Sequence, residues 1–234
     1  MQSIKRLLLC ATVFLIAACG GGGGGGAGGG TTTPLTSPVR EVIQKVLTTA
    51  STYTATSTDG LTLSVTFNQL VDGRFSAATP VSKVTSVSSL VRNASGTLST
   101  DQTIIYFNVV APFAFVATEG RRIDTATVIP ETAVSGASGQ MYLSNGNGRG
   151  LFGIPPLEGT WSVEPSTDGK LWVCVISRLG YGLLSAPGFE STTITTYCFK
   201  TDATGTISGF KASIATDERS TSNTPVVDRF NFGG

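Results

Sequence analysis

The segment spanning residues 61–68, Leu-Thr-Leu-Ser-Val-Thr-Phe-Asn, alternates apolar and polar side chains without interruption. Because successive side chains of a β-strand point to opposite faces, this alternation predicts a strand whose four apolar residues, from Leu61 to Phe67, face a core. Asp59-Gly60 directly precedes the segment and is a hairpin turn signal. The pattern therefore predicts a β-hairpin that turns near residue 60.

Similar strand patterns recur along the rest of the chain. We expect further strands over residues 83–91, 96–99, 103–110, 113–118, 124–129, 140–144, 159–164, 170–177, 192–199, 205–214 and 226–232. Ile104 to Val110 and Leu171 to Ile176 are apolar on both faces, which is typical of central strands. Pro112 interrupts the apolar stretch 103–118, which therefore predicts two strands and no membrane helix.

Turn signals separate these strands in the second half as well. Asp168-Gly169 and the stretch from Asp202 to Gly205 are two of them. The tetrapeptide Ser-Thr-Asp-Gly occurs at residues 57–60 and again at 166–169, each time before an expected strand. It records either two related β modules or a favoured turn that is used twice, and we favour the second interpretation.

One short helix is expected before the strands. Ser37 is placed to cap it, and Pro38 suits its first helical position. The apolar residues at helical spacing are Val39, Val42, Ile43, Val46 and Leu47. This stripe predicts an amphipathic helix over residues 38–48 that packs against a sheet. The sequence as a whole predicts an all-β fold: an antiparallel sandwich or barrel of about ten strands with one short N-terminal helix.

The N-terminus has the order of features found in an export signal. Lys5 and Arg6 precede an apolar run from Leu7 to Ile16, and this run is too short to span a bilayer with these flanks. The following residues complete Ile-Ala-Ala-Cys at positions 16–19, which resembles the lipobox of bacterial lipoproteins. The alternative is an ordinary secretory signal that contains a chance cysteine.

The lipobox resemblance implies a specific modification and location. Cys19 would receive a diacylglyceryl group, the chain would be cleaved before it, and the new amino terminus would be acylated, with palmitate as the expected chain. Several acyl chains are needed for stable anchoring, because one chain holds a protein only marginally. In lipoproteins, Asp after the cysteine favours retention in the inner membrane. Gly20 therefore favours the outer membrane, on its periplasmic side or at the cell surface.

Three regions follow from this interpretation. Residues 1–18 are the signal peptide, and residues 19–36 are the lipidated cysteine and a flexible glycine-rich tether. Residues 37–234 form the β-rich domain. The tether spans roughly 20 Å on average.

The cysteines, the net charge and the absence of histidine limit the functions that are open to the β-rich domain. Cys174 and Cys198 remain after cleavage and lipidation, and in an oxidising compartment they predict one disulfide. They can lie opposite each other if 170–177 and 192–199 pair antiparallel. Removal of the signal leaves 14 basic residues against 15 acidic ones, which argues against nucleic-acid binding. The chain contains no histidine, which excludes Ser-His-Asp and Cys-His catalysis and the usual zinc sites.

A pair of carboxylates is the enzyme chemistry that remains, as in glycoside hydrolysis. The acidic residues in the least turn-like contexts are Glu119, Asp124, Glu158 and Glu164. None of the four stands in a recognisable motif, so we name no catalytic residue, metal ligand or cofactor.

Two long loops are candidate binding surfaces. Their candidate contact residues are Arg149 and Phe152 in the first, and Tyr181, Leu183, Leu184 and Phe189 in the second. Apolar residues in such loops line a ligand mouth or a protein interface, or they fold back and close the end of a sandwich or barrel. We favour the closing role, because open ends must be covered.

The expected function is therefore that of a membrane-anchored envelope lipoprotein. Its β domain would be non-catalytic and would bind an envelope protein, a glycan or a small ligand, or would serve a structural role. The alternatives are a carboxylate-dependent hydrolase of envelope polysaccharide and an accessory subunit of a secretion or surface-display system.

Overall fold

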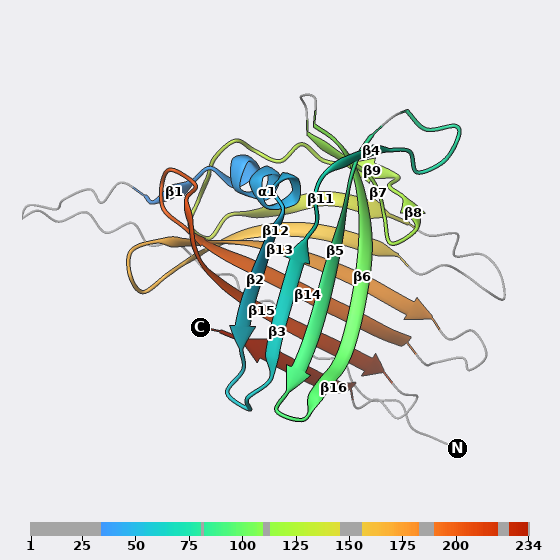
Figure 1. Cartoon of the computed structure of the whole chain (residues 1–234). Helices are drawn as coiled ribbons and strands as arrows, with labels where there is room; N and C mark the ends of the chain where they lie inside the picture. Colours follow the sequence, from blue (N-terminus) through green and yellow to red (C-terminus); the bar gives the residue numbers. More distant parts are fainter. Residues whose placement is uncertain are drawn as a thin grey trace, which may run out of the picture. The chain divides into compact units, whose positions relative to one another are not determined.

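Two seven-stranded antiparallel sheets pack face to face and share one hydrophobic core (Figure 1). The computed structural model describes residues 34–80, 82–109, 113–145, 156–182, 190–219 and 225–233, all within the unit Pro34–Gly234. Cys19, the residues predicted to form the signal peptide and most of those predicted to form the tether lie outside these ranges. No helix in the described ranges is long and apolar enough to cross a membrane.

The first sheet contains the N-terminal strands. They are β2 (Ser51–Thr56), β3 (Thr62–Phe67), β4 (Val71–Gly73), β5 (Ser82–Asn93), β6 (Gly96–Asn108), β7 (Ala114–Thr118) and β8 (Arg121–Arg122). Their order is β2-β3-β5-β6-β7-β8, and β4 pairs with β5. The hairpin expected near residue 60 joins β2 to β3, and Gly60 has a φ of 79° in its turn. That prediction is confirmed.

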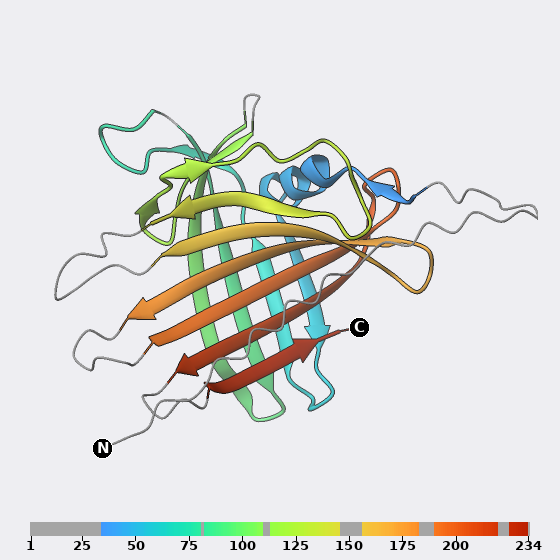
Figure 2. The ribbon, with the colours of Figure 1, turned by 180° about the vertical axis from the view of Figure 1, so that it is seen from behind.

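The second sheet is a meander built from the C-terminal half. Its strands are β9 (Thr125–Ala126), β11 (Ser138–Ser144), β12 (Leu157–Pro165), β13 (Leu171–Gly182), β14 (Glu190–Thr201), β15 (Ile207–Arg219) and β16 (Pro225–Phe232). The order β16-β15-β14-β13-β12-β11-β9 keeps chain neighbours adjacent from β11 onward. Seen from behind, these yellow-to-red strands cross the blue-to-green strands of the first sheet (Figure 2).

The all-β prediction is confirmed. The described residues contain 16 strands, and five of these have two or three residues. Such short strands leave no periodic pattern in a sequence. Each of the longer strands except β2 overlaps a predicted segment. Two of the short strands, β1 (Thr36–Ser37) and β10 (Ala133–Val134), form a separate two-stranded sheet.

The predicted helix is present as α1 (Val39–Thr48), and its apolar stripe is buried. The predicted cap is wrong. Pro38 occupies the N-cap position, and no side chain caps the helix. Ser37 instead pairs with Ala133 between β1 and β10, is fully buried, and its hydroxyl is hydrogen-bonded to that of Thr201 at 3.2 Å. A buried hydroxyl needs a hydrogen-bond partner. The Ser37 hydroxyl has Thr201 as its partner and does not cap the helix.

Two details of the sixth strand differ from expectation. The segments predicted at 96–99 and 103–110 form one strand, β6, which runs from Gly96 to Asn108. Its outer face is open to solvent at Ile104, which is 45% exposed, so the expected burial on both faces is wrong. β6 is central in the strand order, but only one face of its sheet meets the second sheet.

The two copies of Ser-Thr-Asp-Gly form matching hairpin turns. The Gly60 N–H donates to the Ser57 carbonyl at 3.1 Å, and the Gly169 N–H donates to the Ser166 carbonyl at 3.3 Å. Both glycines have positive φ, 79° and 76°. Positive φ is readily adopted by glycine, which explains the repeated choice of residue.

The chain passes from the first sheet to the second at Ile123 and Asp124. The Ile123 N–H donates to the carbonyl of Val116 in β7, and the Asp124 N–H donates to the carbonyl of Leu143 in β11, both at 3.0 Å. These bonds join the sheets along one side. Tyr53 of the first sheet also packs edge-to-face on Phe199 of the second, with ring centroids 5.0 Å apart. This contact sets the separation of the two sheets near Phe199.

Candidate functional site

A cavity of about 120 Å³ lies between the two sheets and beneath α1. Its lining comes from α1, from β3, β5, β6 and β7 of the first sheet, and from β11, β13 and β14 of the second. The apolar lining residues are Ile43, Val46, Leu47, Phe67, Val87, Ile105, Phe115, Val175 and Phe199. The polar lining residues are Ser89, Asp101, Thr103, Thr118, Glu119, Tyr142, Ser177, Thr195 and Tyr197. The cavity is therefore apolar on one part of its wall and polar on the other.

On β5 and β6 the inward-facing residues change from apolar to polar at the same level. Val87 lines the cavity on β5 and is followed by Ser89 two residues later, while on β6 Ile105 gives way to Thr103 and then to Asp101. Because Val87 pairs with Thr103 and Ser89 with Asp101, the hydroxyls and the carboxylate form one group on the inner face.

The facing strands of the second sheet repeat this change. Val175 is followed by Ser177 on β13, and Ser177 pairs with Thr195 on β14. The next inward positions on β5 and β13 are Val91 and Leu179, which are apolar and pack against the core. The polar residues therefore form a band within the sandwich, which we call the polar band: Ser89, Asp101, Thr103, Glu119, Ser177 and Thr195.

Glu119, a member of the polar band, lies in the tight turn of the β7–β8 hairpin. It is the first residue of the two-residue turn between β7 and β8, and Thr118 pairs with Arg121 across that turn. Glu119 and Gly120 have φ values of 50° and 66°. Both central residues of a type I′ turn need positive φ, a conformation that favours Asn or Gly over Glu. The Glu119 carboxylate accepts a hydrogen bond of 2.5 Å from the Thr103 hydroxyl of β6, which fixes it against the cavity wall.

Two tyrosine hydroxyls complete the polar lining. Burial raises the pKa of Tyr142 to about 12; a hydrogen bond with Ser177 opposes this shift, and the Glu119 carboxylate adds to it. Burial also raises the pKa of Tyr197 to about 12; a hydrogen bond with Ser89 opposes this shift, and Asp101 and Glu119 add to it. Both phenols are therefore neutral at physiological pH. The Glu119 carboxylate follows a strand of the first sheet, and it helps to raise the pKa of both tyrosines, which belong to the second sheet.

The strand opposite Tyr142 leaves room for its ring. Gly159 of β12 pairs with Tyr142, and a Cβ atom at residue 159 would lie 2.2 Å from the Tyr142 ring. The ring therefore lies flat across the glycine and reaches the cavity. Its other neighbour is Phe115, with ring centroids 4.9 Å apart.

The predicted disulfide is present. Cys174 pairs with Cys198 between β13 and β14, and their sulfur atoms are bonded. Both cysteines are buried beside Trp172, in a cluster separate from the main core. Lys200 and Lys211 lie 4.9 and 4.8 Å from the Trp172 ring centroid.

Three potential metal-ligating residues come together at the disulfide. The ligand atoms of Glu164, Cys174 and Cys198 lie within 4.8 Å of one another. A metal ion is bound by cysteine thiolates, and these two sulfurs are already joined to each other. Glu164 forms an ion pair with Lys211 at 3.0 Å. This cluster is therefore structural.

The structure does not describe the side chains of the predicted loop residues. Arg149, Phe152, Leu183, Leu184 and Phe189, like the predicted lipidation site Cys19, lie outside the described residues. The backbone of Tyr181 belongs to β13, where it pairs with Ser191. The interpretation of these loops stays a prediction.

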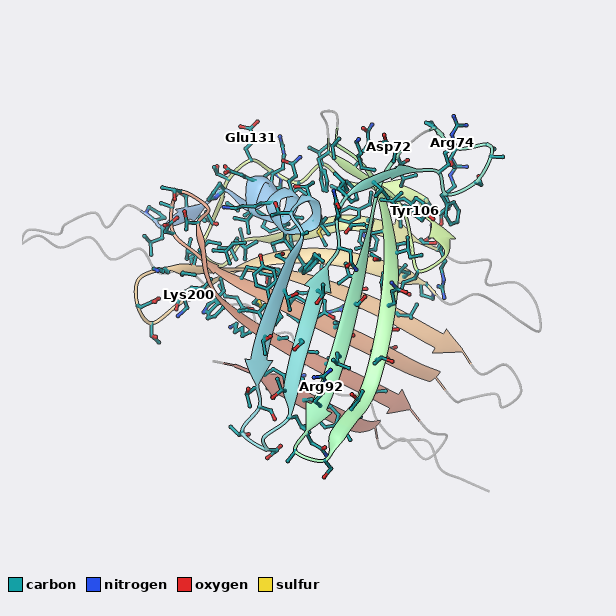
Figure 3. All side chains as sticks on the ribbon, viewed as in Figure 1. Asp72, Arg74, Arg92, Tyr106, Glu131 and Lys200 are labelled. Atoms are coloured by element: carbon teal, nitrogen blue, oxygen red, sulfur yellow. A yellow bond between two sulfur atoms is a disulfide. The ribbon has the colours of Figure 1, made fainter. Side chains whose placement is uncertain are left out.

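Of the four carboxylates selected from the sequence, Glu119 alone is in the cavity lining. It is also in a turn, contrary to the context expected for it. Asp124 accepts a hydrogen bond from the Asn145 N–H at 2.7 Å, and Glu158 and Glu164 form ion pairs with Arg178 and Lys211. Other charged side chains, such as those of Asp72, Arg74 and Glu131, lie at the periphery of the sandwich (Figure 3).

Sequence reasoning missed Asp101, Tyr142 and Tyr197. A signal for Asp101 exists in the strand pattern, because polar residues replace apolar ones at successive inward positions of β6. The tyrosines carry no such signal, because only the fold shows that their hydroxyls converge. No protein-family model, curated protein or solved structure matches the chain. The function is therefore argued from the site itself.

Proposed function

We propose that this protein is an outer-membrane lipoprotein whose β-sandwich binds a small, partly apolar ligand in the cavity between its sheets. The anchor is supported by the Ile-Ala-Ala-Cys pattern at residues 16–19 and by Gly20. The binding role is supported by the cavity, whose apolar wall and polar band suit a ligand with one apolar and one polar end.

The size of the cavity is the observation that carries the binding role. Protein interiors are close-packed, and each 100 Å³ of unfilled space costs roughly 2 kcal/mol of folding free energy. A cavity of about 120 Å³ is similar in size to an engineered protein cavity of roughly 150 Å³ that binds benzene. A ligand with a body the size of one ring therefore fits.

A pair of neighbouring threonines on β14 allows a matched test. Thr195 lines the cavity, whereas Thr196 is the next residue and faces the other side of the sheet. Benzyl alcohol is titrated into full-length protein in maltoside micelles and followed by NMR. We expect the wild type and Thr196→Phe to show saturable shifts with the same Kd, and Thr195→Phe to lose them because its ring fills the cavity.

Two results would contradict the binding role. One is the absence of saturable shifts in the wild type. The other is equal binding by Thr195→Phe and Thr196→Phe, which would assign the shifts to the micelle or to another surface.

The carboxylate-dependent hydrolase is the second candidate, because Asp101 and Glu119 line the same cavity. In that role one carboxyl would act as the general acid and the other as the nucleophile or base. Turnover assays on envelope polysaccharides separate the two functions. The binding proposal requires no turnover, whereas turnover that disappears in Glu119→Gln and in Asp101→Asn would establish catalysis.

A further inference from the structure

The charged side chains among the described lining residues of the cavity are of one sign. Asp101 and Glu119 are the carboxylates that line it, and none of the lining residues within the described part of the chain is a lysine or an arginine. The ion pairs that the structure records between described residues involve Asp72, Glu131, Glu158, Glu164 and Asp168 as the acids. Neither cavity carboxylate belongs to these pairs. A bound anion would therefore be repelled by these two carboxylates, and a bound cation would be attracted by both.

Aromatic rings form a second, independent feature of the same wall. Phe67, Phe115, Tyr142, Tyr197 and Phe199 all line the cavity. The face of an aromatic ring attracts a cation, and cages of such rings bind quaternary ammonium groups. Tyr142 and Tyr197 also stay neutral because burial raises the pKa of each, so their rings and hydroxyls persist in one charge state.

The backbone conformation of Glu119 supports a functional role for its negatively charged carboxylate. A long side chain at positive φ is uncommon, and residues held in such conformations cluster at functional sites. Asn or Gly would suit this turn better but would not place a carboxylate on the wall. The hydrogen bond from Thr103 holds the carboxylate there.

We propose that the ligand is an organic ammonium cation, with an apolar body of about one ring and a positively charged nitrogen. The nitrogen lies between the carboxylates of Asp101 and Glu119 and the faces of Tyr142 and Tyr197. The apolar body contacts the wall formed by α1 and the core strands. This inference rests on the proposed ligand-binding function and adds the charge of the ligand.

Choline and 3,3-dimethyl-1-butanol provide a direct test. The two molecules have the same shape, and a carbon atom in the alcohol replaces the positive nitrogen of choline. Both are titrated into the full-length protein in maltoside micelles by calorimetry and NMR. We expect choline to bind at least tenfold more tightly than the alcohol, because its quaternary nitrogen is attracted by the carboxylates and by the faces of the aromatic rings, whereas the neutral carbon of the alcohol is not.

Substitutions assign the preference to the two carboxylates. Glu119→Gln keeps an oxygen that can accept the Thr103 hydrogen bond, and Asp101→Asn changes an exposed residue, so both preserve the fold. Each is expected to weaken choline binding about tenfold while changing the affinity for the alcohol by less than about twofold. Glu158→Gln on β12 is the matched control and leaves both affinities unchanged, because Glu158 pairs with Arg178 outside the cavity lining.

The outcomes separate the two proposals. Equal affinities for choline and its neutral analogue would overturn the cation inference and leave the binding function intact. The same holds if Glu119→Gln and Asp101→Asn bind choline as the wild type does. If neither probe binds and Thr195→Phe changes nothing, the proposed function fails and the cation inference fails with it.

Discussion

Glu119 occupies a backbone conformation that costs free energy and that most residues at its position would avoid. Its φ of 50° lies in the left-handed region, where non-glycine residues are strained by about 1 kcal/mol or more. This conformation places one carboxylate against Thr103 and near enough to raise the pKa of two tyrosines. At the scale of single residues, the site therefore combines a strained acid with two neutral phenols.

The two phenols predict a specific loss of stability at alkaline pH. The pKa of Tyr142 and of Tyr197 rises from 10.0 in the unfolded chain to about 12 in the folded protein. The folded state holds these protons more tightly, so the stabilising contribution is complete below pH 10 and is lost as the pH rises from 10 to 12. Each tyrosine should contribute on the order of 2 kcal/mol to this loss.

Denaturant unfolding measured across the alkaline range tests this expectation. The double variant Tyr142→Phe with Tyr197→Phe should lose markedly less unfolding free energy between pH 10 and pH 12 than the wild type, because it has no buried phenols to ionise there. Absorbance titration of tyrosinate should show two late-titrating groups in the wild type that the double variant lacks. Parallel alkaline curves for the two proteins would refute the assignment.

Among the elements, the β13–β14 hairpin links the cavity to the outer face of the second sheet. Its inward residues Val175, Ser177, Thr195 and Tyr197 line the cavity. Its outward residues include the Cys174–Cys198 disulfide, which closes a chain segment of sequence separation 24. The same two strands therefore carry a covalent link on one face and part of the site on the other.

Removal of this disulfide should destabilise the fold. Replacing both cysteines with alanine should lower the unfolding free energy by about 3 to 4 kcal/mol, from the loop entropy of the unfolded chain. Alanine is preferred to serine because both positions are buried and a hydroxyl would lack a partner. Urea unfolding checks the value, and reduced wild type should lose a similar amount. A loss below about 1 kcal/mol in both experiments would show that strand pairing alone holds the hairpin.

Elements of this kind were largely predictable from the sequence, and the reasons are local. Alternation at Leu61 to Phe67, turn glycines at 60 and 169, and the apolar stripe of α1 each depend on neighbouring residues only. The prediction that Ser37 caps the helix was wrong, because the Ser37 hydroxyl is hydrogen-bonded to Thr201, a residue that is distant in the sequence. The prediction that both faces of β6 are buried was wrong, because burial of the outer face depends on how the two sheets are arranged.

At the scale of the whole molecule, the cavity could not be predicted, because its wall is assembled from both sheets and a helix. The span from Ile43 to Phe199 covers most of the described chain. Strand patterns give the face of each residue but not which sheets meet. Only the pairing of Ser89 with Asp101 and of Ser177 with Thr195, on two facing sheets, brings the polar band together.

The proposed membrane anchor also concerns the whole protein, and one substitution tests it. We expect Cys19→Ala to move the protein from the membrane fraction to the soluble fraction, because the thiol that carries the lipid is gone and the acyl chains hold it there. Cys10→Ala lies inside the expected signal peptide and should leave fractionation unchanged. Membrane association of Cys19→Ala equal to that of the wild type would contradict the anchor.

The polar band also bears on how the strands find their partners during folding. Shifting β6 by two residues against β5 would keep the same face inward but would bring Asp101 opposite Val87, where Thr103 now pairs. At that level the carboxylate would enter the apolar core, where an unpaired charge costs several kcal/mol. The same residues that line the cavity in the folded protein therefore also disfavour misaligned pairing of β5 with β6 while the protein folds.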